Sequence, residues 1–149
     1  MAAVVDTNVW VVANGGHSHA PVECQQRCAA ALENLRAGGV LAVDERFEIL
    51  GEYYSELPQD SFSYRLLNLL QRQAGKLEYR PCSRYEDGNI VVPACLHGLD
   101  RDDWKFAAVS LTYDPPAPVL NAVDTDWQEC GEGRAEAGIT VQELCPAHV

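Results

Sequence analysis

Short apolar runs without polar alternation recur along the chain. Residues 2–5, 40–43 and 119–123 show this pattern. Residues 77–80 and 139–141 are strand candidates without it, the last as a closing edge strand. Runs of this kind are typical of strands that are buried on both faces of a parallel sheet. The pattern therefore predicts a sheet built from short, buried strands.

Apolar residues at helical spacing occupy much of the sequence between these runs. The predicted helices cover residues 21–37, with Pro21 in the first turn, residues 44–57, with Asp44 as N-cap, and residues 61–74, with Ser61 as N-cap; a fourth opens at residues 100–103. The inward positions are Cys28, Ala31, Leu32 and Leu35, then Ile49, Leu50, Tyr53 and Leu57, then Phe62, Leu66, Leu69 and Leu70. Residues 13–20, 82–98 and 131–138 are predicted as loops. Strands that alternate with helices predict parallel pairing through right-handed crossovers.

Length and composition indicate one globular domain. The 149 residues are 47% apolar and 22% charged, which suits a single domain over residues 1–149. We expect a three-layer α/β domain with a central, mostly parallel sheet flanked by helices. The net charge of −11 argues against a protein that coats nucleic acid, because such a protein needs a basic face. It is compatible with an enzyme that meets nucleic acid at one patch, with bound cations offsetting part of the charge.

The termini and cysteines suggest a location. The N-terminus has no basic region, Asp6 interrupts any apolar core of a signal peptide, and no apolar run reaches the roughly 18 residues of a membrane-spanning helix. We therefore expect a cytoplasmic protein that does not contact a membrane. Its six cysteines include no Cys-x-x-Cys pair, so they are expected to be reduced thiols.

One group of metal-ligand types lies close together in the sequence. His17, His19, Cys24 and Cys28 fall within a dozen residues. They could bind zinc if the loop folded back on the following helix, where the two cysteines lie one turn apart. The alternative is that Cys28 packs inward as a small apolar residue and the histidines lie on a loop.

Carboxylates follow two of the buried runs and open one helix. Asp6 ends the first run, Asp124 and Asp126 follow the run at 119–123, and Asp103 lies at the start of the fourth helix. The carboxyl ends of parallel strands share one edge of the sheet, where open α/β folds bind their ligands. We therefore expect these acids to converge at that edge.

Three more polar residues belong to this predicted site. Thr7 and Asn8 can orient the Asp6 carboxylate or cap the turn behind it. Glu52 lies at the border of the apolar stripe of its helix, and the glutamates one turn to either side are rival candidates. The simpler alternatives are that Asp6 is a helix cap and that Glu52 is a solvated charge.

Four motifs occur in order along the chain. They are an apolar strand that runs into Asp6-Thr7-Asn8, the segment Ile49-Leu50-Gly51-Glu52-Tyr53, Asp103 followed by Phe106-Ala107-Ala108, and Asp124 followed by Asp126-Trp127. Over almost the whole chain this order resembles the PIN-domain nuclease family, including its small ribonucleases. The sequence departs from the family pattern at Ala122, where the family usually has Thr or Ser. That departure concerns the fine positioning of a metal or its water.

The predicted catalytic site is a cluster of four acids from four elements: Asp6, Glu52, Asp103 and Asp124. Such a cluster needs a counter-charge, because adjacent carboxylates repel. A hard divalent cation such as Mg²⁺ or Mn²⁺ removes the conflict, and such a site supports phosphodiester hydrolysis by an activated water. The resemblance implies that Asp6, Asp103 and Asp124 are metal ligands and that Asp126 is auxiliary. It implies that Glu52 is a ligand or positions water.

The resemblance also implies an activity and partners. The activity is that of a metal-dependent endoribonuclease acting on single-stranded or structured RNA. Many small PIN proteins are dimeric toxins silenced by an antitoxin, so the expected partners are RNA, an antitoxin-like inhibitor and a second copy of the chain. Arg65, Arg72 and Lys76 are the candidate RNA contacts, with a solvated helix face as the alternative.

Two other functions belong to different classes. The first is a non-catalytic PIN-like scaffold that binds a protein partner through its acidic surface, which the net charge favours. The second is a phosphatase of the haloacid-dehalogenase type with Asp6 as covalent nucleophile. That chemistry requires an aspartate two residues later, where this chain has Asn8.

Overall fold

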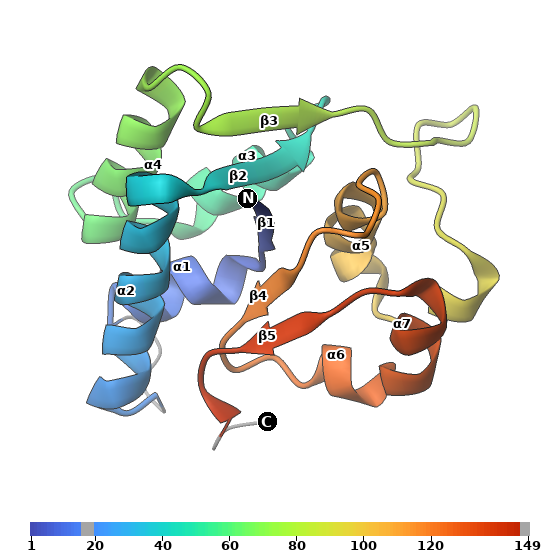
Figure 1. The fold of residues 1–149 in the computed structure, drawn as a ribbon. Coiled ribbons are helices and arrows are strands. Elements are labelled where there is room, and N and C mark those ends of the chain that lie inside the picture. Colours follow the sequence, from blue (N-terminus) through green and yellow to red (C-terminus); the bar gives the residue numbers. More distant parts are fainter. Residues whose placement is uncertain (16–19, 147–149) are drawn as a thin grey trace.

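A five-stranded, all-parallel sheet forms the centre of the molecule (Figure 1). The computed structural model describes residues 1–15 and 20–146. Strand order is β3-β2-β1-β4-β5. The strands are β1 (Ala2–Val5), β2 (Val40–Asp44), β3 (Leu77–Arg80), β4 (Val119–Asn121) and β5 (Val141–Glu143). The chain thus begins in the middle strand and ends at an edge strand, so β1 is covered on both sides by strands that follow it in the sequence.

Helices flank the sheet in a three-layer α/β arrangement. They are α1 (Thr7–Ala13), α2 (Val22–Gly38), α3 (Glu48–Glu56), α4 (Phe62–Arg72), α5 (Trp104–Ser110), α6 (Asp126–Glu129) and α7 (Gly131–Ala137), with short 3-10 turns η1 (Ala94–Leu96) and η2 (Arg101–Asp103). Helix α1 packs against α2, α3 and α4, which form one group in Figure 1. Helix α5 packs against β1, β2 and β4. The predicted three-layer α/β fold class, with a central parallel sheet flanked by helices, is therefore confirmed.

The core lies between the sheet and these helices. Val4, Val5 and Val43 are fully buried, as expected for strands covered on both faces. The predicted inward stripe of α3 is confirmed, since Ile49, Leu50, Tyr53 and Leu57 are all at most 6% exposed. Helix α4 differs from its prediction: Phe62 and Leu69 are exposed, and Leu67 is buried in their place.

Helix α1 follows β1 directly; the sequence indicated it only through the alternative that Asp6 is a helix cap. Three β-branched valines and a tryptophan dominate residues 9–12, and such residues locally favour a strand. The helix forms because Asp6 caps it and because Val9, Trp10 and Val12 all reach the core. Tertiary burial therefore overrides local propensity here.

Helix α3 begins four residues later than predicted. Asp44 is the last residue of β2, and its fully buried carboxylate accepts hydrogen bonds from the N–H groups of Arg46, Glu48 and Ile49. The chain turns through Phe47, which adopts a left-handed conformation with φ of 62°. A turn therefore separates β2 from α3, and Asp44 at the end of the strand accepts hydrogen bonds from the first N–H groups of the helix.

The C-terminal part departs furthest from the sequence prediction. Residues 131–137 form α7 where a polar loop was predicted, and β5 lies two residues later than expected. Helix α7 packs against η1, and at Gly133 the two backbones are so close that a Cβ would lie 1.9 Å from the Cys95 carbonyl oxygen. The glycines that indicated a loop are thus partly explained by a helix crossing.

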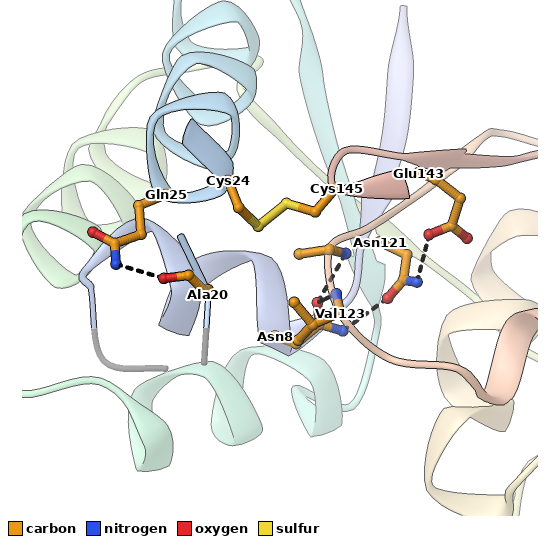
Figure 2. The surroundings of a disulfide bond; sticks show 9 residues. Asn8, Ala20, Cys24, Gln25, Asn121, Val123, Glu143 and Cys145 are labelled. Atoms are coloured by element: carbon orange, nitrogen blue, oxygen red, sulfur yellow. Dashed lines mark hydrogen bonds between the residues drawn. A yellow bond between two sulfur atoms is a disulfide. The ribbon is translucent and has the colours of Figure 1, made fainter. Parts of the chain in front are cut away.

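A disulfide joins α2 to the segment after β5, contrary to the expectation of six reduced thiols. Cys24 and Cys145 are bonded across 121 residues of sequence (Figure 2). The sequence did not indicate this pair, because it depends on the edge position of β5. Cys28 is free and fully buried, as the apolar alternative expected. His17 and His19 lie outside the described residues. In the described part of the chain, no helix is long and apolar enough to cross a membrane.

Candidate metal centre

Three carboxylates from distant parts of the chain converge at the carboxyl ends of the central strands. Asp6, Asp103 and Asp124 each place one oxygen within 4.8 Å of the other two. Asp6 and Asp103 are 4% and 7% exposed, and Asp124 is partly buried. The structure thus brings together the three predicted ligands.

Local structure fixes each of these acids. Asp6 ends β1 and caps α1, where its side chain accepts from the Asn8 N–H. Asp103 ends the 3-10 turn η2 and immediately precedes α5. Asp124 follows β4, and its carboxylate accepts from the N–H of Asp126 at 2.9 Å. Asp126 lies beside this group, because its N–H donates to Asp124 and its negative charge contributes to the raised pKa of Asp103.

A tryptophan that was not among the predicted site residues holds Asp6 in position. The indole Nε1–H of Trp127 donates to Asp6 Oδ2 at 2.9 Å, and Trp127 is fully buried. It comes from α6, two residues after Thr125 and one after Asp126. The sequence offers only the aromatic residue next to an acid as a signal, because the contact arises from β4 pairing with β1.

Asn8 holds the loop that carries Asp124. Its Oδ1 accepts from the N–H groups of Ala122 and Val123 at 2.9 and 3.2 Å. Its Nδ2 donates to Asn121 Oδ1 at 3.0 Å (Figure 2). Asn121 donates in turn to the backbone carbonyl of Asp124. The backbone after β4 is therefore held by Asn8, so the position of Asp124 does not depend on a hydroxyl side chain at residue 122.

Glu52 lies beside the three acids, but both of its oxygens are engaged within the protein. Thr7 Oγ1 donates to Oε2, and the Lys105 ammonium lies 2.9 Å from Oε1. The Lys105 side chain is only 13% exposed. Lys105 was not predicted; the available signal was a lysine two residues after Asp103. Thr7 therefore supports Glu52 and not, as expected, the neighbouring Asp6.

Burial and mutual repulsion strongly disfavour the ionised cluster. Burial raises the pKa of Asp6 to about 6, and the nearby Asp124 adds to this, although the Trp127 hydrogen bond opposes it. Burial, followed by the charges of Asp6 and Asp124, raises the pKa of Asp103 to about 9. The pKa of Asp124 is also raised, mainly by burial. A bound cation would relieve this unfavourable charge.

The predicted RNA-contacting residues do not lie at this cluster. The Lys76 ammonium donates to the Gly39 carbonyl. Gly39 directly precedes β2 and Lys76 directly precedes β3, so both lie at the amino ends of these strands, opposite the acids. Arg72 lies in the last turn of α4, which leads to the same edge, and Arg65 is exposed on that helix. Lys105 is the cation that the structure places beside the carboxylates.

Comparison with known proteins does not assign the chain to a family: no family model, curated protein or solved structure that was searched matches it. The chemistry of the site must therefore be judged from its donor atoms and their surroundings. Three converging carboxylates with raised pKa values are a donor set that fits a hard divalent cation such as Mg²⁺ or Mn²⁺.

Proposed function

We propose that this protein is a divalent-metal-dependent endoribonuclease of the PIN-like type. The observation that carries the proposal is the convergence of Asp6, Asp103 and Asp124 at the carboxyl edge of a parallel sheet, within 4.8 Å of one another. That edge is where open α/β folds act on their ligands. The choice of RNA as substrate rests on the resemblance in the order of the motifs.

The proposed roles follow from the contacts of each side chain. Asp6, Asp103 and Asp124 would hold Mg²⁺ or Mn²⁺, with Asp126 as an auxiliary acid whose N–H donates to the Asp124 carboxylate. When bound, the cation would supply a lowered pKa for water and stabilise the leaving oxygen of a phosphodiester. Glu52, held by Thr7 and Lys105, is better placed to orient water than to bind the cation.

The Asn8 contacts argue against the phosphatase alternative. A phosphatase with Asp6 as nucleophile needs an acid/base group two residues later. Asn8 stands there, and its amide is committed to Asn121 and to the backbone of Ala122 and Val123. It therefore cannot serve as that group.

The cellular role remains part of the proposal. A toxin silenced by an antitoxin-like protein, acting as a homodimer in the cytoplasm, is the role that the resemblance favours. The net charge of −11 favours a second candidate, a non-catalytic scaffold that binds a protein partner through its acidic surface. The retained acids favour the enzyme.

Cleavage of mixed RNA and DNA pools tests the proposal. Purified protein is incubated with single-stranded RNA or DNA in the presence of Mg²⁺, Mn²⁺ or chelator, beside an Asp6→Asn variant. We expect RNA to be cut only with metal, and the rate to fall by about two orders of magnitude or more in the variant, because a buried ligand charge is lost.

Asp60→Asn is the matched control, because Asp60 is an exposed aspartate in the turn before α4. It should cut RNA at the wild-type rate. Intact RNA with both metals, or equal cutting by wild type and Asp6→Asn, would reject the nuclease and favour the scaffold.

A further inference from the structure

A cleft of about 420 Å³ opens between three parts of the fold. Asn89 and Ile90, from the segment 81–98, line it together with Glu52 of α3 and with Trp104 and Lys105 at the start of α5. We call it the Trp104 cleft. Its volume lies within the range of small-molecule binding sites in proteins.

The Trp104 cleft borders the carboxylate cluster. Trp104 follows Asp103 directly in the chain. Glu52, which lines the cleft, accepts a hydrogen bond from Thr7, the residue after Asp6. A group bound in the cleft would therefore lie next to the proposed site of cleavage.

The wall formed by segment 81–98 is firmly attached. The Arg84 guanidinium, whose side chain is 5% exposed, pairs with Asp44, Glu45 and Glu48 at 3.2–3.3 Å. Arg84 also donates to the Gly88 carbonyl, immediately before the lining residue Asn89. The predicted loop over residues 82–98 thus forms a preorganised wall of the cleft.

The charges in the Trp104 cleft are poorly suited to a phosphate group. Glu48, Glu52 and Asp102 contribute three carboxylates, against the two cations Arg101 and Lys105. Lys105 already pairs with Glu52, and the Arg101 guanidinium lies 5.0 Å from the centre of the indole ring. An anion here would face a net negative lining whose cations are engaged.

The same lining suits a flat, uncharged group that carries hydrogen-bonding atoms along its edge. The indole of Trp104 is partly exposed, with the His97 ring stacked on it at 5.2 Å between ring centres and the Arg101 guanidinium over the ring, so a base would stack on the exposed Arg101 plane at the indole. Ile90 offers a buried apolar contact, and Asn89 and Asp102 offer hydrogen-bonding groups. Proteins bind unstacked nucleobases by stacking them on aromatic rings or arginine planes and by hydrogen bonds to their edges.

We propose that the Trp104 cleft binds one unpaired nucleobase of the RNA strand, next to the phosphodiester that is cut. This inference rests on the proposed function for its substrate, but base binding can be measured without cleavage. The cleft would then select single-stranded or looped RNA, because a base inside a duplex cannot enter it.

Tryptophan fluorescence tests base binding directly in the wild-type protein. Trp10 and Trp127 are fully buried, so Trp104 is the tryptophan that a ligand in the cleft can quench. With chelator present, the protein is titrated with AMP, CMP, GMP and UMP, and with ribose 5-phosphate as a base-free control. We expect saturable quenching by at least one nucleotide and none by ribose 5-phosphate. Trp104→Phe should lose this response.

Two results would overturn the proposal. Quenching by ribose 5-phosphate equal to that by nucleotides would indicate a phosphate site, and no saturable quenching by any of the four nucleotides would indicate no base site. Neither result depends on cleavage, so base binding can fail while the nuclease stands, and base binding can be found even if no RNA is cut.

Cleavage of RNA that lacks a single base extends the test to the full substrate. A base-free nucleotide is moved stepwise along a short single strand. In wild type, kcat/KM should fall about tenfold or more at one position beside the cut, the size expected from lost stacking. Trp104→Ala should show no such position. Tyr85→Ala changes an exposed aromatic residue on segment 81–98 and should behave as wild type. Identical profiles for wild type and Trp104→Ala would contradict the proposal.

Discussion

Trp127 determines how Asp6 is presented to a cation. Its indole N–H donates to Asp6 Oδ2 at 2.9 Å in a buried setting, which favours the ionised carboxylate and fixes its orientation. Trp127→Phe removes the donor and keeps most of the ring. We expect the pKa of Asp6 to rise further above 6 and the affinity for Mn²⁺ to fall about 10- to 100-fold, as measured by titration calorimetry.

Trp10→Phe provides the matched control. Trp10 is equally buried and, within the described residues, forms no hydrogen bond with Asp6. Its replacement should lower stability through lost packing but leave Mn²⁺ affinity unchanged. Equal losses of affinity in both variants would mean that Trp127 acts through general packing and not through Asp6.

The raised pKa values make stability depend on pH and on metal. The folded-state pKa values of Asp6 and Asp103, about 6 and about 9, exceed the value near 4 of an unfolded aspartate. Their contribution to stability is therefore full below about pH 4 and is lost as the pH rises through these two values. A divalent cation favours the ionised forms, so its stabilising effect should grow with pH.

Thermal unfolding from about pH 5 to about pH 8, with chelator or Mn²⁺, measures this effect. The metal concentration is held at about 100 times the Kd measured at the alkaline end. The metal-induced stabilisation should then be near zero at the acid end and approach about 2.7 kcal/mol at the alkaline end. Asp6→Asn should be more stable than wild type in chelator at pH 8, yet respond less to metal. A metal effect independent of pH would exclude these carboxylates as ligands.

At the scale of elements, the crossing of α7 and η1 depends on one glycine. A Cβ on Gly133 would lie 1.9 Å from the backbone oxygen of Cys95, so Gly133→Ala must push two backbones apart. We expect the free energy of unfolding to fall by about 1–3 kcal/mol. In the same helix, a Cβ on Gly131 meets none of the described atoms within 4 Å. Gly131→Ala should be neutral or stabilising by up to about 1 kcal/mol.

Urea denaturation of the two variants checks this comparison. If both alanines changed stability equally, the contact between α7 and η1 would not constrain the fold. If Gly133→Ala remains folded, its rate of RNA cleavage would show whether the contact between α7 and η1 influences the three carboxylates.

Elements that follow from local pattern could be predicted, and those that depend on tertiary contact could not. Strands β1 and β3 match their predicted bounds because short apolar or alternating runs determine them locally. Helix α1 was missed because its valines favour a strand in isolation. Helix α7 was missed because its glycines serve a crossing that the sequence does not reveal.

The candidate site divides in the same way. Asp6, Asp103 and Asp124 could be predicted because each stands at a strand end or a helix start, positions visible in the sequence. Trp127 and Lys105 could not, because their partners depend on how β4 and α5 are placed beside β1. The candidate RNA contacts Arg72 and Lys76 lie away from the carboxylates, because the end of α4 and the start of β3 are at the opposite ends of the strands.

At the scale of the whole molecule, the Cys24–Cys145 bond connects α2 to the segment that follows β5. Disulfides persist in oxidising compartments, whereas the sequence favoured the reducing cytoplasm. Alkylation of the denatured protein without reductant should label four cysteines, compared with six after reduction. Labelling of all six in freshly lysed cells would show that the bond is absent there.

The same bond has an expected energetic effect. Cys145→Ser should lower the free energy of unfolding by about 2–4 kcal/mol under oxidising conditions and by much less under reducing conditions. Cys130→Ser, at a buried free cysteine, should change stability by a similar amount in both conditions. A redox-independent loss in Cys145→Ser would exclude the disulfide as its cause.

The central place of β1 affects how the protein is made. Strand β1 leaves the ribosome before its neighbour β4, and Trp127 stands 121 residues after its partner Asp6. Translation proceeds at about 5–20 residues per second, so several seconds pass before the last acid of the centre emerges. A growing chain therefore cannot assemble the centre before residue 127 has emerged, and any nuclease activity would begin only after that point.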